Sequence, residues 1–271
     1  MNDPGGYQSH AFIAELYDQV IPYRERTDVA FYVDTAKQHG GPVLEVGCGT
    51  GRVLIPTARA GIEIVGVDLS SSMLDVCRQR LADEPADVQV RARVVEADMR
   101  DFSLGETFAL ATIPFRPFQH LISVGEQLAC LASIRRHLEP GGRLVLDVFN
   151  PMLESLTRDN LGEEMGEEPV FTTPDGRQVT RWYRTLARDF HQQVIHVELI
   201  YYVSHPDGRQ ERLVHAFPMR YFFRYEMEHL LARCGFEVLE VLADFDRKPY
   251  GSIYPGDLIF LAQKSASGQG E

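Results

Sequence analysis

Apolar residues between positions 40 and 150 come in short runs that alternate with stretches of helical periodicity. This alternation predicts a doubly wound α/β fold, in which helices cover both faces of a mostly parallel sheet. The predicted strands of this part are Pro42–Val46, Glu63–Val67, Arg91–Val95, Phe108–Ile113 and Arg143–Phe149.

Helix-capping residues stand between these runs. Ser70 precedes a segment with apolar residues at helical spacing, and Ser123 with Glu126 forms a capping box ahead of another. The Pro-Gly-Gly at 140–142 then ends the second helix. Upstream, apolar residues four apart across 12–20 predict an N-terminal helix that lies over the domain.

The pattern changes after Asn150. Residues 152–168 are acidic and poorly periodic, and beyond them Asp175-Gly176 and Asp207-Gly208 each stand between alternating runs. Asp-Gly favours the tight turn of a β-hairpin, so we predict an antiparallel cap inserted after the fifth strand. Its strands are expected at Val170–Thr172, Val179–Arg188, Gln193–Val203 and Arg212–Phe222.

A helical pattern resumes at Met227 and ends at Gly235, which suits a C-cap. Strands at Phe236–Val241 and Leu258–Ala262 follow. The predicted division of the chain is 1–150 with 223–264 as one domain, 151–222 as the cap, and 265–271 as a small polar tail that frays.

Composition narrows the class of protein. The 271 residues carry a net charge of −12, which argues against a nucleic-acid partner. No run of eighteen apolar residues occurs, and the N-terminus lacks a basic region and an apolar core. We therefore expect a soluble, cytoplasmic protein without a membrane span. The four cysteines show no paired spacing, so neither disulfides nor a metal site is expected.

The most informative stretch is the apolar strand Val43–Val46 followed by Gly47, Gly49 and Gly51. Glycines let the backbone approach a ligand closely, and exposed amides at the next helix favour negative groups. The spacing is not the Gly-x-Gly-x-x-Gly of a dinucleotide fold, and a tight strand-to-helix turn would need similar residues. Asp68 ends the second strand, where a carboxylate can accept hydrogen bonds from both hydroxyls of a ribose.

These motifs resemble the class I S-adenosylmethionine-dependent methyltransferases, whose first motif is an acidic residue followed by a Gly-x-Gly-x-Gly turn. The resemblance covers nearly the whole chain: Glu45–Gly51, Asp68, Ala97-Asp98-Met99, and Leu138–Leu144 ahead of strand five. It implies a seven-stranded sheet of order 3-2-1-4-5-7-6 with strand 7 antiparallel. It also implies S-adenosylmethionine as the cofactor.

Carried over residue by residue, the resemblance implies that Asp68 binds the ribose, Leu69 packs on adenine, and Asp98 with the Met99 backbone reads the adenine edge. As an alternative, Asp98 could cap a helix. Glu45 lies inside an apolar strand, and its alternative role is solely to hold the glycine loop in shape. The implied cofactor-binding set is Glu45, Gly47, Cys48, Gly49, Gly51, Asp68, Leu69, Met73, Asp98, Met99, Pro114 and Tyr23.

Acceptor chemistry is expected just past strand four, in the segment 112–121, because open α/β sheets bind ligands at the carboxyl ends of their strands. Methyltransferases that act on amino-sugar nitrogens and similar metabolites carry a comparable aromatic segment ending in His-Leu. The resemblance makes His120 the first choice for a general base or acceptor-orienting group, although a helix-start histidine bonded to backbone is the alternative. Thr112–Phe115 departs from the Asn/Asp-Pro-Pro-Tyr of planar-nitrogen methyltransferases, which disfavours DNA-adenine chemistry.

Aromatic and basic residues of the N-terminal segment and the cap are candidates for the acceptor pocket, although sheet packing or a dimer face would use the same residues. In similar enzymes the N-terminal segment folds over the cofactor, and Arg26 could meet a carboxylate. Alternation in one cap strand puts Tyr201 on a packed face and Ile200 on the other. The predicted substrate-binding set is Tyr17, Phe118, Trp182, Tyr201, His215 and Arg220.

The predicted function is transfer of a methyl group from S-adenosylmethionine to a nitrogen or oxygen of a small metabolite by direct displacement. A monomer or homodimer without nucleic acid or membrane as a partner is expected. Three alternatives stay open: a protein or RNA methyltransferase, a non-catalytic cofactor-binding or regulatory module, and, least favoured, a nicotinamide-dependent reductase.

Overall fold

The computed structural model describes residues 5–8 and 10–265. The predicted polar tail therefore lies outside the described residues apart from Ser265. In chain order the elements are α1 (Ala11–Tyr17), α2 (Ile21–Arg24), α3 (Asp28–His39), β1 (Val43–Val46), α4 (Leu54–Arg59), β2 (Ile64–Asp68), α5 (Ser71–Ala82), α6 (Ala86–Gln89), β3 (Ala92–Glu96), β4 (Phe108–Ile113), η1 (Pro117–His120), α7 (Val124–His137), β5 (Leu138–Phe149), α8 (Leu153–Thr157), β6 (Phe171–Thr172), β7 (Gln178–Asp189), β8 (Val194–Ser204), β9 (Gln210–Arg220), α9 (Arg224–Arg233), β10 (Phe236–Leu242) and β11 (Asp257–Lys264).

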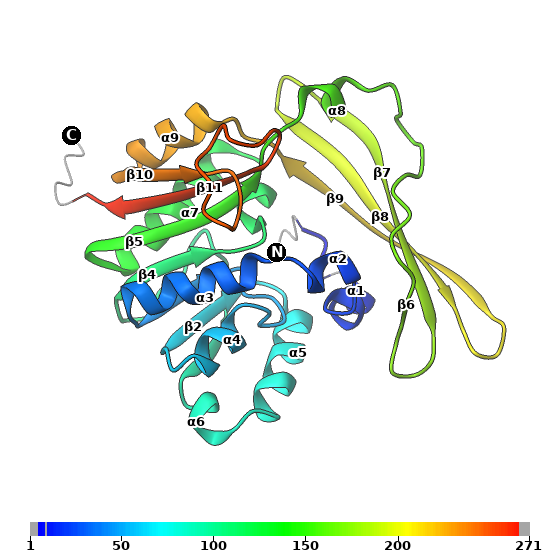
Figure 1. Ribbon diagram of the computed structural model, residues 1–271, viewed down its shortest axis with the longest axis horizontal. Coiled ribbons are helices and arrows are strands. Elements are labelled where there is room, and N and C mark those ends of the chain that lie inside the picture. Colours follow the sequence, from blue (N-terminus) through cyan, green and yellow to red (C-terminus); the bar gives the residue numbers. More distant parts are fainter. Residues whose placement is uncertain (1–4, 9, 266–271) are drawn as a thin grey trace.

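A seven-stranded sheet forms the centre of the molecule, in the order β10-β11-β5-β4-β1-β2-β3 (Figure 1). Strands β1 to β5 are parallel, whereas β11 runs antiparallel to both β5 and β10. Numbered within this sheet, the order is 3-2-1-4-5-7-6 with the seventh strand antiparallel. The predicted fold is confirmed.

Helices cover both faces of this sheet, so each face has its own apolar core. Helices α7 and α9 contribute Ile134 and Met227 to one cluster, while α3 and α4 contribute Phe31 and Leu54 to the other. The predicted caps are present: Ser70 Oγ accepts from Met73 N–H, and a capping box begins α7. Local capping therefore sets where the helices that flank the ligand-binding edge begin.

Strand β5 and helix α3 differ from the prediction. Strand β5 begins at Leu138 rather than Arg143, because Leu138 already pairs with Phe108 before residues 139–142 bulge out of the register. Helix α3 has no counterpart among the predicted elements. Its buried residues include Asp28 and Thr35 beside Phe31, so its inner face does not read as an apolar stripe.

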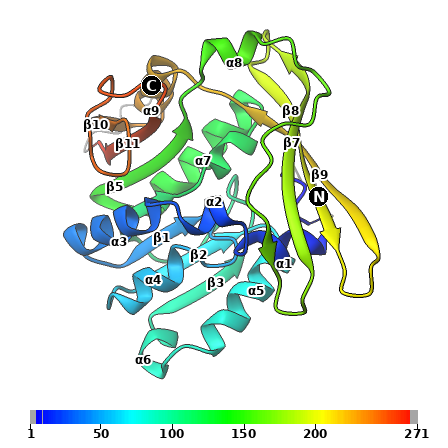
Figure 2. The same ribbon diagram turned by 45° about the vertical axis from the view of Figure 1, so that its right-hand side comes forward.

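A second sheet of order β6-β7-β8-β9 follows β5 and stands beside the core (Figure 2). Gly176 and Gly208, at φ +85° and +89°, form the turns that connect its hairpins, as the two Asp-Gly dipeptides predict. Ile200, on the face of β8 opposite Tyr201, is also fully buried. Its directly paired neighbours Trp182 and Val214 share that face and form an apolar row with it.

The N-terminal helices fill the space between the two sheets (Figures 1 and 2). Leu16 of α1 and Val20 pack in one cluster with Val179, Tyr201 and Val203 of the second sheet. This placement agrees with the predicted N-terminal helix over the domain, and apolar contacts join that helix to the cap.

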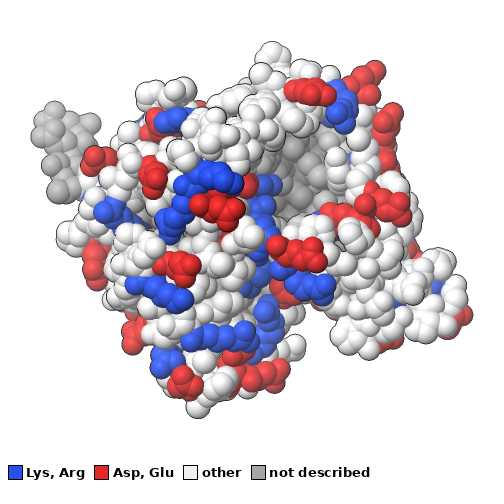
Figure 3. Space-filling model, in the orientation of Figure 1, with Lys and Arg blue, Asp and Glu red and all other residues white. Residues whose placement is uncertain are grey.

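The described part of the chain contains no helix that is both long and apolar enough to cross a membrane. On the face seen in Figure 3, basic and acidic side chains are interspersed rather than gathered into areas of one sign.

Candidate functional site

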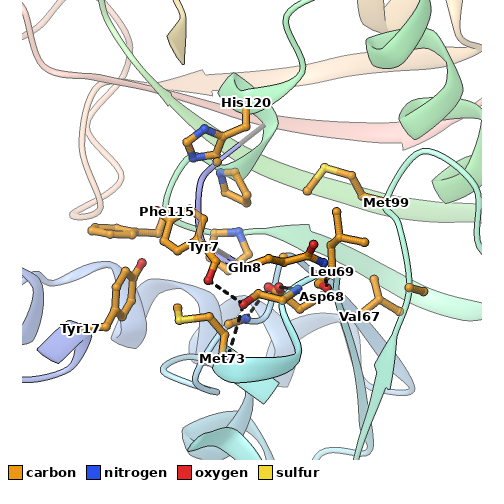
Figure 4. A pocket seen from close by; sticks show the side chains of 17 residues that line it. Tyr7, Gln8, Tyr17, Val67, Asp68, Leu69, Met73, Met99, Phe115 and His120 are labelled. Atoms are coloured by element: carbon orange, nitrogen blue, oxygen red, sulfur yellow. Dashed lines mark hydrogen bonds between the residues drawn. The ribbon is translucent and has the colours of Figure 1, made fainter. Parts of the chain in front are cut away.

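A pocket lies at the carboxyl ends of β1, β2, β3 and β4, the edge at which open α/β sheets bind ligands. Figure 4 shows His120 on the opposite side of this pocket from Asp68 and Met73, with Tyr7 between them. A smaller hollow shares Tyr17 and Phe115 with it and continues toward β1. The two hollows are therefore neighbours on either side of the glycine turn and the loop after β4.

The glycine turn after β1 is built for close approach. Gly47 has φ +75°, and a Cβ placed there would lie 2.7 Å from Cγ of Pro117. At Gly51, with φ +79°, a Cβ would lie 2.6 Å from Sγ of Cys77 on α5. A side chain at either position would push apart the loop after β4 or the helix that follows β2. Backbone conformation and packing thus both require glycine here.

Asp68 is oriented by the backbone around it. Its Oδ2 accepts from Gly49 N–H at 2.8 Å, and its Oδ1 accepts from Ser70 N–H at 2.8 Å. These bonds hold the Asp68 carboxylate in the pocket wall, where each oxygen can also accept from a ligand hydroxyl.

Glu45 of β1 is buried at the edge of the smaller hollow. Burial raises the pKa of this carboxyl well above its ordinary value, and the charge of Asp68 adds to the effect while Arg52 opposes it. Among the described residues, its Oε2 has no hydrogen-bond partner. A buried carboxylate oxygen in this state is suited to a cationic ligand group.

The loop after β4 forms the wall that faces Asp68. Phe115 and Arg116 both adopt left-handed conformations, at φ 68° and 73°. Asp147 of β5 stabilises this turn, because its Oδ1 accepts from Phe115 N–H at 2.7 Å and from the Tyr32 hydroxyl at 2.7 Å. Arg116 is paired with Asp257 at 2.7 Å. Burial raises the pKa of Asp147.

The N-terminal segment contributes three pocket residues that the sequence did not predict, namely Gly5, Tyr7 and Gln8. Gln8 Nε2 donates to the Leu69 carbonyl at 2.6 Å, and the Tyr7 carbonyl accepts from Ser70 Oγ at 3.2 Å. The Tyr7 ring lies 5.7 Å from His120 and 4.9 Å from His215. An aromatic residue in a short glycine-containing stretch just before the first helix was the available signal.

Tyrosine hydroxyls in the pocket stay protonated. Burial raises the pKa of Tyr7 and of Tyr17 well above the ordinary value of 10.0. Both phenols can donate a hydrogen bond at neutral pH, and neither can serve as the base.

The structure brings half of the predicted site residues together in the main pocket. Cys48 and Glu45 line the smaller hollow, and burial raises the Cys48 pKa well above 9.0, which fits a packing role rather than a nucleophile. The predicted residues that line the main pocket are Gly47, Gly49, Asp68, Leu69, Met73, Met99, Pro114, Tyr17 and His120.

Asp98 lies outside the pocket lining, although its neighbours Ala97 and Met99 belong to it. Its carboxylate accepts from Nε and Nη2 of Arg100, at 2.9 and 2.5 Å, and this guanidinium lowers the Asp98 pKa. Arg100 also pairs with Glu126 of α7 at 2.7 Å. The Asp98 carboxylate is therefore already paired with the guanidinium of Arg100.

Three predicted substrate residues do not reach the pocket. Phe118 is fully buried against Phe222 in the core, with ring centroids 5.6 Å apart. Trp182 pairs with Ile200 and so points to the face of the cap opposite Tyr201. Arg220 donates to the Ile122 carbonyl at the base of the cap.

The other predicted residues surround the pocket without lining it. The Tyr201 ring contacts Phe12 at 5.6 Å, and His215 Nε2 donates to the Gly5 carbonyl at 2.6 Å. Tyr23 lies between Phe115, at 4.7 Å, and the guanidinium of Arg181 from the cap, at 4.2 Å.

Arg26, expected to meet a carboxylate, is paired with three protein carboxylates. They are Asp28, Asp147 and Asp257.

Comparison with known proteins agrees with this geometry. Residues 43–142 match the family model of the methyltransferase domain. The chain is 25 % identical over 254 residues to YqeM of Bacillus subtilis (strain 168), across 93 % of this chain and 96 % of YqeM. It is 35 % identical over 141 residues to dTDP-3-amino-3,6-dideoxy-alpha-D-glucopyranose N,N-dimethyltransferase of Streptomyces fradiae, across 50 % of this chain and 52 % of that enzyme. The match thus spans about half the length of the amino-sugar relative.

Among solved structures, the S-adenosylmethionine-bound CalS10, an amino pentose methyltransferase from Micromonospora echinaspora, matches with a TM-score of 0.64. The identity is 27 %, over 89 % of this chain and 91 % of CalS10. This chain is an S-adenosylmethionine-dependent methyltransferase.

The residues of the methyltransferase cavity fit its cofactor. Glu45, buried with an oxygen lacking a partner among the described residues, suits an ammonium group. Asp68 suits a pair of ribose hydroxyls, and Leu69 with Met99 offers an apolar wall for a purine. Because the two hollows share five lining residues, an elongated ligand that spans both would reach all of these groups.

Proposed function

We propose that this methyltransferase transfers a methyl group to an amine nitrogen of a small metabolite, with His120 accepting the proton. The observation that carries the proposal is the position of His120 in an aromatic pocket wall across from Asp68. The N,N-dimethyltransferase activity in the name of the Streptomyces fradiae relative supports nitrogen over oxygen.

His120 is the residue best suited to accept the proton from the amine. The titratable side chains that line the main pocket in the described part of the chain are Tyr7, Tyr17, Asp68 and His120. Both tyrosines stay protonated at neutral pH, and Asp68 is engaged by two backbone amides. Histidine is a common general base in enzymes, and an ammonium acceptor must lose a proton before its nitrogen can attack the methyl group.

The remaining residues bind and orient. When bound, S-adenosylmethionine supplies an electrophilic methyl group, so the protein contributes mainly position. We assign the ammonium of the methionyl end to Glu45, the ribose to Asp68, and the adenine to Leu69 and Met99. Tyr7 and Tyr17 exclude water from the aromatic end and can donate hydrogen bonds there.

The division of labour along the chain is part of the proposal. Residues 1–150 and 223–264 bind the cofactor, while residues 151–222 cover the acceptor. The proposal also includes a small acceptor, a protein that is a monomer or a homodimer, and a cytoplasmic location. The net charge of −12 supports a small acceptor over a nucleic acid, because proteins that bind nucleic acids usually present a basic surface. On the face seen in Figure 3, acidic side chains stand among the basic ones.

A labelled-methyl assay over a panel of acceptors tests the function. We expect transfer to amino sugars and other small amines, and little or none to matched hydroxyl compounds in which oxygen replaces the amine. Calorimetric binding of S-adenosylhomocysteine is measured in parallel. Transfer to peptides or RNA alone would contradict the acceptor class, and binding without turnover on any acceptor would point to a regulatory module.

A further inference from the structure

Gln119 is fully buried next to His120, and its side-chain amide joins the two points where the chain crosses between core and cap. Its Oε1 accepts from Phe149 N–H, at the last residue of β5, over 3.0 Å. Its Nε2 donates to the carbonyl of Arg220, the last residue of β9, over 2.7 Å. Strand β5 leads into the cap and β9 leads out of it.

Contacts around this amide connect the cap to the candidate base. The ring of Phe217, on β9, lies 5.2 Å from the ring of His120. Arg220 Nη1 donates to the Ile122 carbonyl at 3.2 Å, and its Nη2 is paired with Glu226 of α9 at 3.0 Å. The end of β9, the loop that carries His120 and the start of α9 therefore form one bonded unit.

We propose that Gln119 is a positioning residue that couples the cap to His120. This inference rests on the proposed function, because it takes His120 as the base. A base must stand within hydrogen-bond reach of the proton that it accepts, and the cap covers the acceptor. A side chain without the amide would leave the Phe149 N–H and the Arg220 carbonyl unpaired in the interior, so the junction would shift to satisfy them.

The test compares Gln119→Leu with Gln127→Leu. Gln127 is also a buried glutamine, and its Nε2 donates to the Leu121 carbonyl at 2.9 Å in the same connection, but to no cap residue among those described. We expect Q119L to lower kcat on an amine acceptor about 100-fold, since a displacement near 1 Å costs about that much. S-adenosylhomocysteine affinity should change less than about twofold in both variants, and Q127L should keep kcat within about threefold.

Amide hydrogen exchange at Phe149 supplies a readout that does not depend on turnover. The exchange should be faster in Q119L and unchanged in Q127L, because only Q119L removes the acceptor of that amide. Unchanged exchange in Q119L, or an equal loss of kcat in Q127L, would overturn the proposal. If the wild-type protein methylates no amine, the proposed function fails, and the exchange still decides whether Gln119 holds the junction.

Gln119→Glu is a second variant in case Q119L does not fold. An ionised glutamate can still accept from Phe149 N–H, but it has no donor for the Arg220 carbonyl. We expect normal exchange at Phe149 with a reduced kcat. A wild-type kcat in this variant would show that the link to β9 does not position His120.

Discussion

The cofactor half and the acceptor half of the site are assembled in different ways. The cofactor half comes from the ends of β1 and β2, where Gly47 N–H donates to Val67 O at 2.8 Å and Gly49 N–H donates to Asp68. The acceptor half joins residues far apart in the chain, since the His120 ring lies within 6 Å of the rings of both Tyr7 and Phe217. Backbone bonds hold the first, and side-chain contacts hold the second.

This difference has a functional meaning. The cofactor half is built from backbone hydrogen bonds and depends on glycine positions and on a few carboxylates. The same cofactor half can therefore be combined with any acceptor. A half built from side-chain contacts between the N-terminal segment, the loop after β4 and the cap changes with each of those side chains. Under the proposed function we therefore expect acceptor choice to depend on the long-range contacts, and binding of the methyl donor on the local ones.

The largest effect is expected at the acceptor half. His120→Gln removes the base, and we expect kcat to fall about 100- to 10,000-fold. S-adenosylhomocysteine affinity, measured by calorimetry, should not change, because Asp68 and Glu45 are intact. His196→Gln, at an exposed position on β8, is the control and should keep the wild-type rate. A normal kcat in His120→Gln would place the proton elsewhere.

The cofactor half should respond through affinity. Asp68→Ala removes the acceptors for two ribose hydroxyls, and bonds to a charged group are worth about 1.5–3 kcal/mol each. We expect at least about 100-fold weaker S-adenosylhomocysteine binding. Asp75→Ala, on the next helix with a 66 % exposed side chain, should bind as the wild type does. Unchanged affinity in Asp68→Ala would remove this residue from the site.

Glu45 separates cofactor binding from stability. Because burial raises its pKa above the ordinary 4.5, the folded protein favours the protonated form, and stability falls as pH rises from about 4.5 toward the folded pKa. Glu45→Gln should therefore be more stable than the wild type by about 1 kcal/mol near neutral pH, and equal to it near pH 4.

The same substitution should weaken S-adenosylhomocysteine binding about tenfold, because the charge opposite the ammonium is lost. Urea unfolding at the two pH values and calorimetry measure the two effects. A variant that is less stable at neutral pH and binds normally would show that Glu45 only supports the glycine loop.

The smallest effect is expected at the tip of the cap. Gly208 has φ +89°, like the pocket glycines, but a Cβ there would meet no atom within 4 Å. Gly208→Ala should cost about 1 kcal/mol of stability through backbone strain and leave kcat unchanged. Gly47→Ala has similar strain and a clash with Pro117 as well, so cofactor binding should be lost. Equal effects of the two substitutions on cofactor binding would contradict the expectation that packing against Pro117, and not backbone strain alone, makes glycine necessary at position 47.

Local signals predicted most of the fold. Capping at Ser70 and Ser123 and the two Asp-Gly turns were confirmed because each depends on residues within a few positions of one another. Helix α3 was missed because its buried face includes polar residues that find partners only in the folded chain, such as Asp28 with Arg52 at 2.5 Å. The early start of β5 was missed because pairing to β4 overrides the Pro-Gly-Gly stop.

By itself the sequence determined the glycine turn and the acidic residues at the strand ends, and the resemblance of these motifs to the class I methyltransferases implied the order of the sheet and the class of reaction. Only the tertiary structure decided that Asp98 is held by Arg100, that Trp182 faces away from the pocket, and that Tyr7 enters it. The physical reason is range. Turns, caps and strand ends follow from neighbouring residues, whereas ion pairing and the face that a side chain presents depend on elements more distant in the chain.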